Sequence, residues 1–525
     1  MKPKWVIFGA YLCVATVFFG SVFWGEQILG GAQSDIWNSL WSAHFFGTRL
    51  SEGIWSLRTD VLNYPSGGTL WISDPLGAIT MGPLMTLLGI TAGYHVWVIL
   101  CMTALGYCAH GFALDLGAKE GAWIAGFGVF FSGVVQSSIQ NGASEAIHVA
   151  WVLFAVWKLW VYFFKEGDVR WAFFASFMGG ISSWYGAVIV GVFFIAFVLS
   201  SARSSFVWRS SFLLGWCVCL LPWIWLSHLG SQGEDNLISI KGEPLLRQVR
   251  RTIGPADPLS YIMPLDFRSP DFSVMSTYGE DYIHCCYVGW CLLVLCAYTM
   301  RKRKERPLFW SGLTCFVLSL GPVLLHKGSA WIFADDRAIP LPYFLLEFLW
   351  GFDSLSLLYR LSFGVVIVCA LYASLAFQGR KSYLVIGLIF LEWFFVSPVR
   401  DLPQYTALPD TKGLTELRKE PKGAVLHHPI AGGNFYLFEQ IFHGHALIGS
   451  FNFPNNRIGK KIWRELLQME KTKTCVVSSV KEPVYLLIHP LVKHRPMPED
   501  RAIESVINYC RVIYSAEALV VVEIK

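Results

Sequence analysis

Charged residues are scarce in this chain: they make up 15% of its 525 residues, against about 25% in a typical soluble domain. Hydrophobic residues reach 54% and aromatic residues 16%, and the apolar residues form blocks long enough to cross about 30 Å of hydrocarbon. A water-soluble enzyme is therefore excluded, and a polytopic membrane protein is predicted. The net charge of +5 is gathered in short clusters, so we expect no nucleic-acid partner.

Several familiar catalytic motifs are also absent. The sequence has no Gly-x-x-x-x-Gly-Lys-Ser/Thr loop, no His-Glu-x-x-His motif and no Gly-x-Ser-x-Gly turn. An enzyme built from this chain is expected to use a lipid-linked or pre-activated substrate rather than ATP. The sequence shows no internal repeat, which argues against a transporter made of duplicated halves.

Most of the 13 cysteines lie in or beside apolar segments, where a thiol behaves as a small hydrophobe. None of them has the spacing of zinc ligands. Cys475 and Cys510 lie in the polar C-terminal region. These two can pair if that region faces an oxidising compartment.

Basic clusters near residues 165–170, 203–209, 301–304 and 380–381 set the expected orientation, because such clusters favour the cytoplasmic side. The apolar run at 5–24 has no convincing cleavage site and is interpreted as a retained first helix that starts in the cytoplasm. The N-terminus and all four basic clusters can lie in the cytoplasm together only if one of the early apolar segments does not cross the membrane. The best candidate is 77–91, which is short and contains Gly and Pro, and we expect it to re-enter or lie at the outer face. The alternative is that it crosses and another short segment does not.

The expected fold is an all-α polytopic membrane bundle of about eleven transmembrane helices with a C-terminal soluble α/β domain. The bundle covers residues 1–399 and carries large outer loops at 25–76, 230–283 and 327–356. Residues 400–525 form the outward-facing domain, with apolar strand-like runs at 424–426, 475–477, 484–488 and 518–524 and helical patterns near 458–469 and 500–509.

The first outer loop contains the leading candidate acid. Residues 32–50 fit an amphipathic helix whose apolar side suits the membrane interface. Asp35, Asn38 and Arg49 share the opposite, polar side. A carboxylate there can act as a general base for an acceptor hydroxyl or as a ligand of a divalent cation. The alternative is that Asp35 only caps the helix.

Asp74, directly before Pro75, is a second candidate acid, with a turn-forming role as the alternative. Asn141, Glu145 and His148 follow at helical spacing where a long span enters the membrane from outside. Ionisable residues at this depth are costly unless they face a wet cavity or a partner. They are therefore predicted to move a proton or bind a sugar hydroxyl, or else to make a polar contact between helices.

Four arginines on the predicted outer side are candidates for binding a lipid phosphate, because guanidinium groups bind phosphate in a bidentate manner. Arg360 starts a membrane span, and its alternative role is to snorkel to the interface. The other three lie in the long outer loop and have simple solvation as their alternative: Arg247, Arg250 and Arg251. Glu392, inside the last span, has no partner that the sequence identifies.

Short stretches along most of the chain carry a resemblance to a known superfamily. They include Ser34-Asp35-Ile36-Trp37, Tyr64-Pro65-Ser66-Gly67, Asn141-Gly142-Ala143-Ser144-Glu145 and Tyr359-Arg360-Leu361-Ser362-Phe363. The chain resembles the GT-C glycosyltransferases, and in particular a large bacterial branch of them. The resemblance implies that the first-loop acid, Asp35 here, is catalytic or binds metal. The chain has no Asp-x-Asp or Glu-x-Asp pair in this loop, so metal dependence stays open.

The predicted function is a membrane glycosyltransferase at the outer face of a bacterial inner membrane. It moves a sugar from a polyprenyl-phosphate-linked donor to a lipid, glycan or protein acceptor, with a divalent cation as a possible cofactor. Asp35 activates the acceptor, Glu145 and His148 line the cavity, and the arginines neutralise the leaving phosphate. The alternatives are a lipid-linked glycan flippase or a noncatalytic component of glycan assembly.

Overall fold

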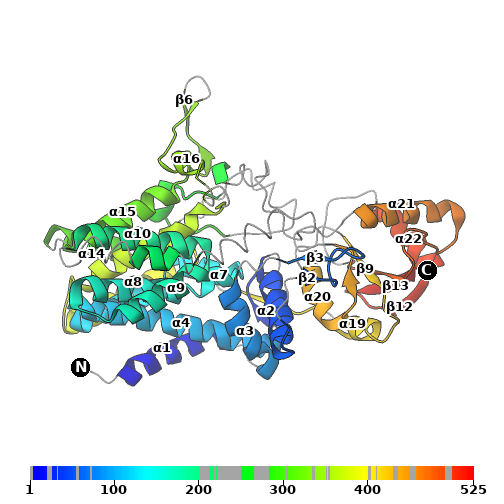
Figure 1. The fold of residues 1–525 in the computed structure, drawn as a ribbon, viewed down its shortest axis with the longest axis horizontal. Helices are drawn as coiled ribbons and strands as arrows, with labels where there is room; N and C mark the ends of the chain where they lie inside the picture. The colour runs from blue at the N-terminus through cyan, green and yellow to red at the C-terminus, as the bar shows by residue number, and fades with distance from the viewer. Residues whose placement is uncertain are drawn as a thin grey trace.

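The structure is a computed structural model that describes residues 4–20, 27–31, 34–54, 58–70, 74–201, 212–217, 220, 250–252, 254–264, 283–302, 305–333, 337–349, 352, 355–399, 404–409, 411–429, 435–449, 457–490 and 499–524. A helical part and a sheet-containing part lie at opposite ends of an elongated molecule, and α2 and α3 lie between them (Figure 1).

The helical part consists of apolar helices that surround a continuous hydrophobic core. Among the described residues, three stretches are long and apolar enough to cross a membrane: Ile90–Asp115, Lys119–Gln140 and Ser144–Lys165. The expected total of about eleven spans stays a prediction. The principal helices are α1 (Lys4–Phe19), α4 (Ile90–Asp115), α5 (Ala122–Phe130), α6 (Gly133–Gln140), α7 (Ser144–Ile147), α8 (Ala150–Lys165), α9 (Val169–Ser182), α10 (Trp184–Ser200), α14 (Trp290–Lys302), α15 (Arg306–Ser319), α17 (Ser362–Ser374) and α18 (Arg380–Phe395).

The amphipathic helix expected in the first outer loop is present as α2 (Ile36–Ser51). Its apolar side does not face outward, because Trp37 and Trp41 are fully buried within the protein. The ring of Trp37 contacts Phe438 of α20 (Phe435–His443) at 4.9 Å between centroids. The predicted membrane-interface role of this side is therefore wrong: the periodicity identified a buried face but not the element that covers it.

Segment 77–91 contributes most of α3 (Pro75–Leu88). At 14 residues this helix is roughly 21 Å long, which is shorter than the hydrocarbon core. It packs closely on α2, since a Cβ added at Gly47 would lie 2.9 Å from Cα of Gly82. Its short length agrees with the expectation that this segment does not cross, which stays a prediction.

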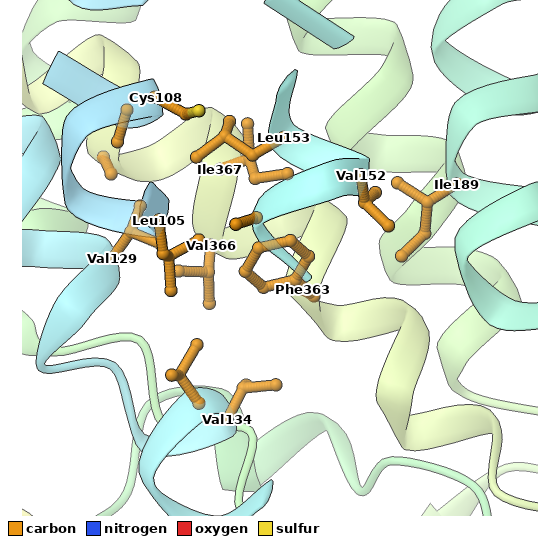
Figure 2. Packing of buried hydrophobic residues seen from close by; sticks show 14 of the residues in the cluster. Leu105, Cys108, Val129, Val134, Val152, Leu153, Ile189, Phe363, Val366 and Ile367 are labelled. Carbon is orange, nitrogen blue, oxygen red and sulfur yellow. The ribbon is translucent and has the colours of Figure 1, made fainter. Parts of the chain in front are cut away.

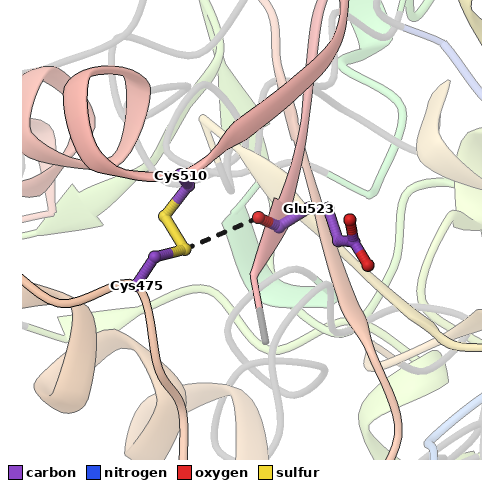
Figure 3. Close-up of a disulfide and its surroundings, with 3 residues drawn as sticks. All are labelled: Cys475, Cys510 and Glu523. Carbon is purple, nitrogen blue, oxygen red and sulfur yellow. Dashed lines mark hydrogen bonds between the residues drawn. A yellow bond between two sulfur atoms is a disulfide. The ribbon is translucent and has the colours of Figure 1, made fainter.

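The C-terminal region folds around a five-stranded mixed sheet with the order β10-β9-β11-β13-β12. Strands are present at three of the four expected runs, and both expected helices are present. The run at 475–477 is irregular, so that prediction is wrong; Cys475 is joined there to Cys510 by a disulfide (Figure 3). The elements are β9 (Ala424–His428), β10 (Ala446–Leu447), β11 (Val484–Ile488), β12 (Arg511–Ser515), β13 (Val520–Ile524), α19 (Thr411–Leu417), α21 (Arg457–Thr472) and α22 (Asp500–Tyr509).

The sheet and the first outer loop are packed against each other. The loop strand β1 (Gln27–Leu29) pairs antiparallel with β8 (Tyr405–Ala407), and one face of the large sheet shares a hydrophobic cluster with α2. Helix α20 also contacts α2, where Trp41 Nε1 donates a hydrogen bond of 2.9 Å to Gln440 Oε1. The opposite sheet face packs against α21 and α22. The two parts of the chain therefore meet along the helix that follows Asp35.

Candidate functional site

Glu145 and Arg360 form an ion pair in the helical part. Glu145 belongs to the short helix α7, and Arg360 lies in a single 3-10 turn, η4 (Leu358–Leu361), directly before α17. Arg360 Nη1 donates to Glu145 Oε1 over 2.5 Å. The arginine side chain is 8% exposed and the glutamate 22% exposed. The fold thus joins two of the predicted site residues, 215 positions apart.

This pair lines a small cavity that is partly open to solvent. Most of the wall is apolar and comes from several helices; Figure 2 labels four of these residues, namely Val134 (α6), Val152 (α8), Ile189 (α10) and Phe363 (α17). Among the described lining residues, the charged ones are Glu145 and Arg360. A guanidinium group at a mostly apolar wall can bind an anionic group that lies next to apolar atoms.

Asn141 was expected to bind substrate, but the structure uses its amide internally. Its side chain exchanges two hydrogen bonds with the backbone of Ile283, of 3.0 and 2.8 Å. Its Nδ2 also donates to the hydroxyl of Tyr359 over 3.5 Å. The predicted helical spacing of Asn141 and Glu145 is wrong, because α6 ends at Gln140 and α7 begins at Ser144. Asn141 lies in the turn before Glu145 and Tyr359 precedes Arg360, so their hydrogen bond ties the two sides of the ion pair together.

His148 does not share the partner of Glu145, because the helix is interrupted between α7 and α8. Its Nε2 lies 2.8 Å from Oδ1 of Asp74, and both side chains are buried. The same carboxylate oxygen accepts a hydrogen bond of 2.7 Å from the backbone N–H of Gly77 and so caps α3. Asp74, expected as a candidate acid or as a turn-forming residue, therefore both caps α3 and pairs with a buried histidine.

Asp35 occupies the N-cap position of α2, but its side chain accepts no capping hydrogen bond. It instead accepts a hydrogen bond of 3.3 Å from Asn38 Nδ2. The backbone holds the residue in place: the Asp35 N–H donates to Asn141 O over 3.0 Å, and Ser39 Oγ donates to Gly142 O over 2.8 Å. The half-buried carboxylate is thus fixed beside the turn that leads to Glu145 without serving as a cap.

Arg49 was placed on the same stripe as Asp35, yet the two lie near opposite ends of α2. A separation of fourteen residues corresponds to roughly 21 Å along a helix. Arg49 Nη1 donates to the backbone oxygen of Arg58 over 2.8 Å, and its guanidinium lies 4.4 Å from the Phe45 ring centre. These contacts give Arg49 a local structural role, away from the proposed acid.

The predicted arginine cluster of the long loop is partly neutralised. Arg250 Nε lies 2.8 Å from Glu347 Oε1, and Arg251 Nη2 lies 2.9 Å from Glu347 Oε2. Arg247 lies outside the described residues. One carboxylate that bridges two guanidinium groups compensates part of the charge that was expected to attract phosphate. Arg360 differs from these two arginines in that it lines the cavity described above.

Glu392 also has its partners in the structure. Its carboxylate accepts hydrogen bonds from the Tyr287 hydroxyl at 2.5 Å, from the Trp290 backbone N–H, and from the Cys291 N–H at 3.0 Å. These groups lie at or next to the start of α14. The acid therefore satisfies unpaired N–H groups of a helix terminus, which the sequence did not reveal.

One cluster was missed by the sequence reasoning altogether: His427, Glu439 and His489, which are buried in the sheet-containing part. A signal was available. His427 directly follows the predicted strand-like run 424–426 and His489 directly follows the run 484–488, and both continue the alternation of their strands. Two histidines at the ends of adjacent parallel strands lie close together, but the pairing of these strands was not predicted.

The architecture of this chain is similar to that of several solved structures. The chain aligns over its whole length with 40% of the mycobacterial arabinofuranosyltransferase AftD, at 12% identity and a TM-score of 0.55. It aligns over its whole length with 98% of ArnT from Cupriavidus metallidurans bound to undecaprenyl phosphate, at 11% identity and a TM-score of 0.50. The chain has the GT-C fold.

A third similar GT-C structure is the oligosaccharyltransferase of Archaeoglobus fulgidus tethered to an acceptor peptide. The alignment covers 93% of this chain and 69% of that one, at 12% identity and a TM-score of 0.51. The sequence matches no family model and no curated protein. The GT-C fold and the long apolar helices together make the chain a membrane protein, and it spans about 40% of the length of AftD.

Proposed function

We propose that this chain is an integral membrane glycosyltransferase. It moves a sugar from a polyprenyl-phosphate-linked donor to a lipid, glycan or protein acceptor at the outer face of a bacterial inner membrane, with its N-terminus in the cytoplasm. The observation that carries the proposal is the Glu145–Arg360 ion pair at the wall of a mostly apolar cavity. The guanidinium group there can bind the phosphate of such a donor.

In the proposed reaction the acceptor hydroxyl oxygen attacks the anomeric carbon of the donor sugar. The bond between that carbon and the phosphate oxygen breaks, and polyprenyl phosphate leaves. Asp35 takes the hydroxyl proton as general base, and Arg360 compensates the charge that develops on the leaving phosphate. Glu145 holds the guanidinium in place before the donor arrives.

The solved GT-C structures support the choice of substrate class. One of them, ArnT, is bound to undecaprenyl phosphate, and another carries an acceptor peptide. The shared fold is compatible with a lipid-linked donor entering from the membrane. The sugar and the acceptor of this chain are left open by the proposal.

Binding of undecaprenyl phosphate to the purified, reconstituted chain tests the proposed role of the cavity. Arg360→Gln is expected to weaken binding at least tenfold, because it removes the buried positive charge that meets the phosphate. Arg170→Gln, at the exposed start of α9, is the matched control and leaves affinity unchanged. Equal affinity in the wild type and Arg360→Gln contradicts the assigned phosphate site.

A further inference from the structure

Three potential metal ligands converge in the sheet-containing part, far along the chain from the site described above. Nε2 of His427 lies 3.0 Å from Oε2 of Glu439, and Nε2 of His489 lies 3.3 Å from the same oxygen. The three ligand atoms all lie within 4.8 Å of one another. The side chains are 7%, 1% and 8% exposed respectively, so the group is closed off from bulk water.

The sheet register explains why these residues meet. Strands β9 and β11 are adjacent and parallel, with Leu487 opposite His427. Because side chains alternate between sheet faces, His427 and His489 fall on the same face as Val425 and Leu487, which belong to the cluster shared with α20. Helix α20 crosses this face and supplies Glu439 from above the two strand ends.

The contacts within the cluster are not those of an ordinary hydrogen-bonded network. Despite the short separations, neither imidazole N–H points at the carboxylate in hydrogen-bond geometry. Within the described part of the chain, His427 Nε2, His489 Nε2 and Glu439 Oε2 are buried atoms without a hydrogen-bond partner. Buried polar atoms are rarely left in this state, and three of them directed at one small volume indicate a missing common partner.

We propose that His427, Glu439 and His489 bind one Zn²⁺ ion. Two imidazole nitrogens and one carboxylate oxygen are a ligand set that Zn²⁺ prefers, whereas Ca²⁺ and Mg²⁺ prefer oxygen ligands only. The site is separate from Asp35, where the sequence allowed a divalent cation, and it does not depend on the proposed transfer reaction.

The position of α20 gives this ion a structural consequence. Glu439 precedes Gln440, which accepts the hydrogen bond from Trp41 of α2, and Phe435 and Phe438 contact Trp37. An ion that ties α20 to the ends of β9 and β11 fixes the surface on which α2 docks. Zinc binding is therefore expected to stabilise the contact between the sheet and the helix that carries Asp35.

The test uses the full chain in detergent, stripped with a chelator and titrated with Zn²⁺ alone, with bound metal measured by mass spectrometry. The wild type is expected to bind about one ion, and Co²⁺ in its place is expected to give the visible absorption of a four-coordinate site made by the three side chains and one bound water. Glu439→Gln and His489→Asn should each weaken binding at least tenfold. His428→Asn is the control, because this neighbouring side chain lies on the opposite face beside Trp463 and leaves binding unchanged.

Hydrogen exchange of the wild type covers the case in which a ligand variant fails to fold. Added Zn²⁺ is expected to slow exchange in β9, α20 and the end of β11. A wild type that takes up no stoichiometric zinc overturns the proposal, and so does zinc uptake without protection of these elements. Unchanged affinity in folded Glu439→Gln and His489→Asn overturns it as well, and makes the cluster a set of directly paired side chains.

Discussion

The backbone N–H of Asp35 donates a 3.0 Å hydrogen bond to the carbonyl oxygen of Asn141. This contact joins the start of α2 to the turn that leads into α7, where Glu145 meets Arg360. The candidate acid and the candidate phosphate ligand are thus positioned by one short segment. Its geometry is expected to control activity as strongly as the side chains do.

Gly142→Ala tests this link. Gly142 has a φ of +63°, and a Cβ there would lie 2.5 Å from Cα and 2.6 Å from N of Ile36. Both the strained backbone and the collision push α2 away from the turn. We expect transfer activity to fall at least tenfold, as measured by release of polyprenyl phosphate. Gly387→Ala, where a Cβ meets nothing within 4 Å, should be active; equal activity in both variants would show that the turn does not position Asp35.

The Glu145–Arg360 pair should behave as a coupled unit in stability measurements. Removing one partner leaves a largely buried, uncompensated charge, whereas removing both does not. We expect Glu145→Ala and Arg360→Ala each to lower the free energy of unfolding by more than half as much as the double variant does. The expected coupling energy is about 1–3 kcal/mol. Thermal unfolding of the four proteins in one detergent measures this. Additive effects would mean that the pair is solvated rather than buried at the cavity wall.

The disulfide between Cys475 and Cys510 closes a loop with a sequence separation of 35. Loop closure of this size is expected to stabilise the folded state by about 4 kcal/mol relative to the open chain. Cys475→Ser with Cys510→Ser should therefore unfold the sheet-containing part at lower denaturant concentration. Peptide mapping without reductant checks the bond itself, and its presence in protein from cells places this region in an oxidising compartment. Free thiols at both positions would contradict the expected outward orientation.

Glu465 gives the sheet-containing part a predictable response to acid. Partial burial acts to raise the pKa of this carboxyl, but hydrogen bonds from Ser478 and Ser479 lower it below 4.5 overall. A folded-state pKa below the unfolded value adds stability above the unfolded pKa, and this stability is lost as the pH falls through the folded pKa. Hydrogen exchange at residues 476–482, corrected for intrinsic rates, should therefore accelerate below about pH 4.5 in the wild type. Glu465→Gln should lose this part of the pH dependence, and an unchanged profile would contradict the assignment.

Local patterns predicted the elements of the sheet-containing part well. The strand at 484–488 and the helix at 500–509 coincide with β11 and α22, because alternation and helical periodicity are local properties. The periodicity of α2 was also recognised. The element that covers the apolar side of α2 was not predicted, since a buried face and a membrane-facing face have the same pattern of residues.

Long-range contacts account for most of what the sequence did not reveal. Arg360 was identified as a functional arginine and Glu145 as a functional acid, but their pairing depends on two helices far apart in the chain. The same holds for Asp74 with His148. The His427, Glu439 and His489 cluster needs the parallel pairing of β9 with β11 and the path of α20 across them, and neither follows from local spacing.

Release of polyprenyl phosphate by the reconstituted chain tests the central claim most directly. A panel of lipid-linked sugars is offered with and without divalent cation to the wild type, to Asp35→Asn, and to Asp60→Asn as an exposed acid of the same loop. The account predicts release by the wild type and Asp60→Asn and its loss in Asp35→Asn, because the acceptor proton has no base. Equal release by the wild type and Asp35→Asn would contradict the role of Asp35, and no release by any of the three would contradict the transferase itself.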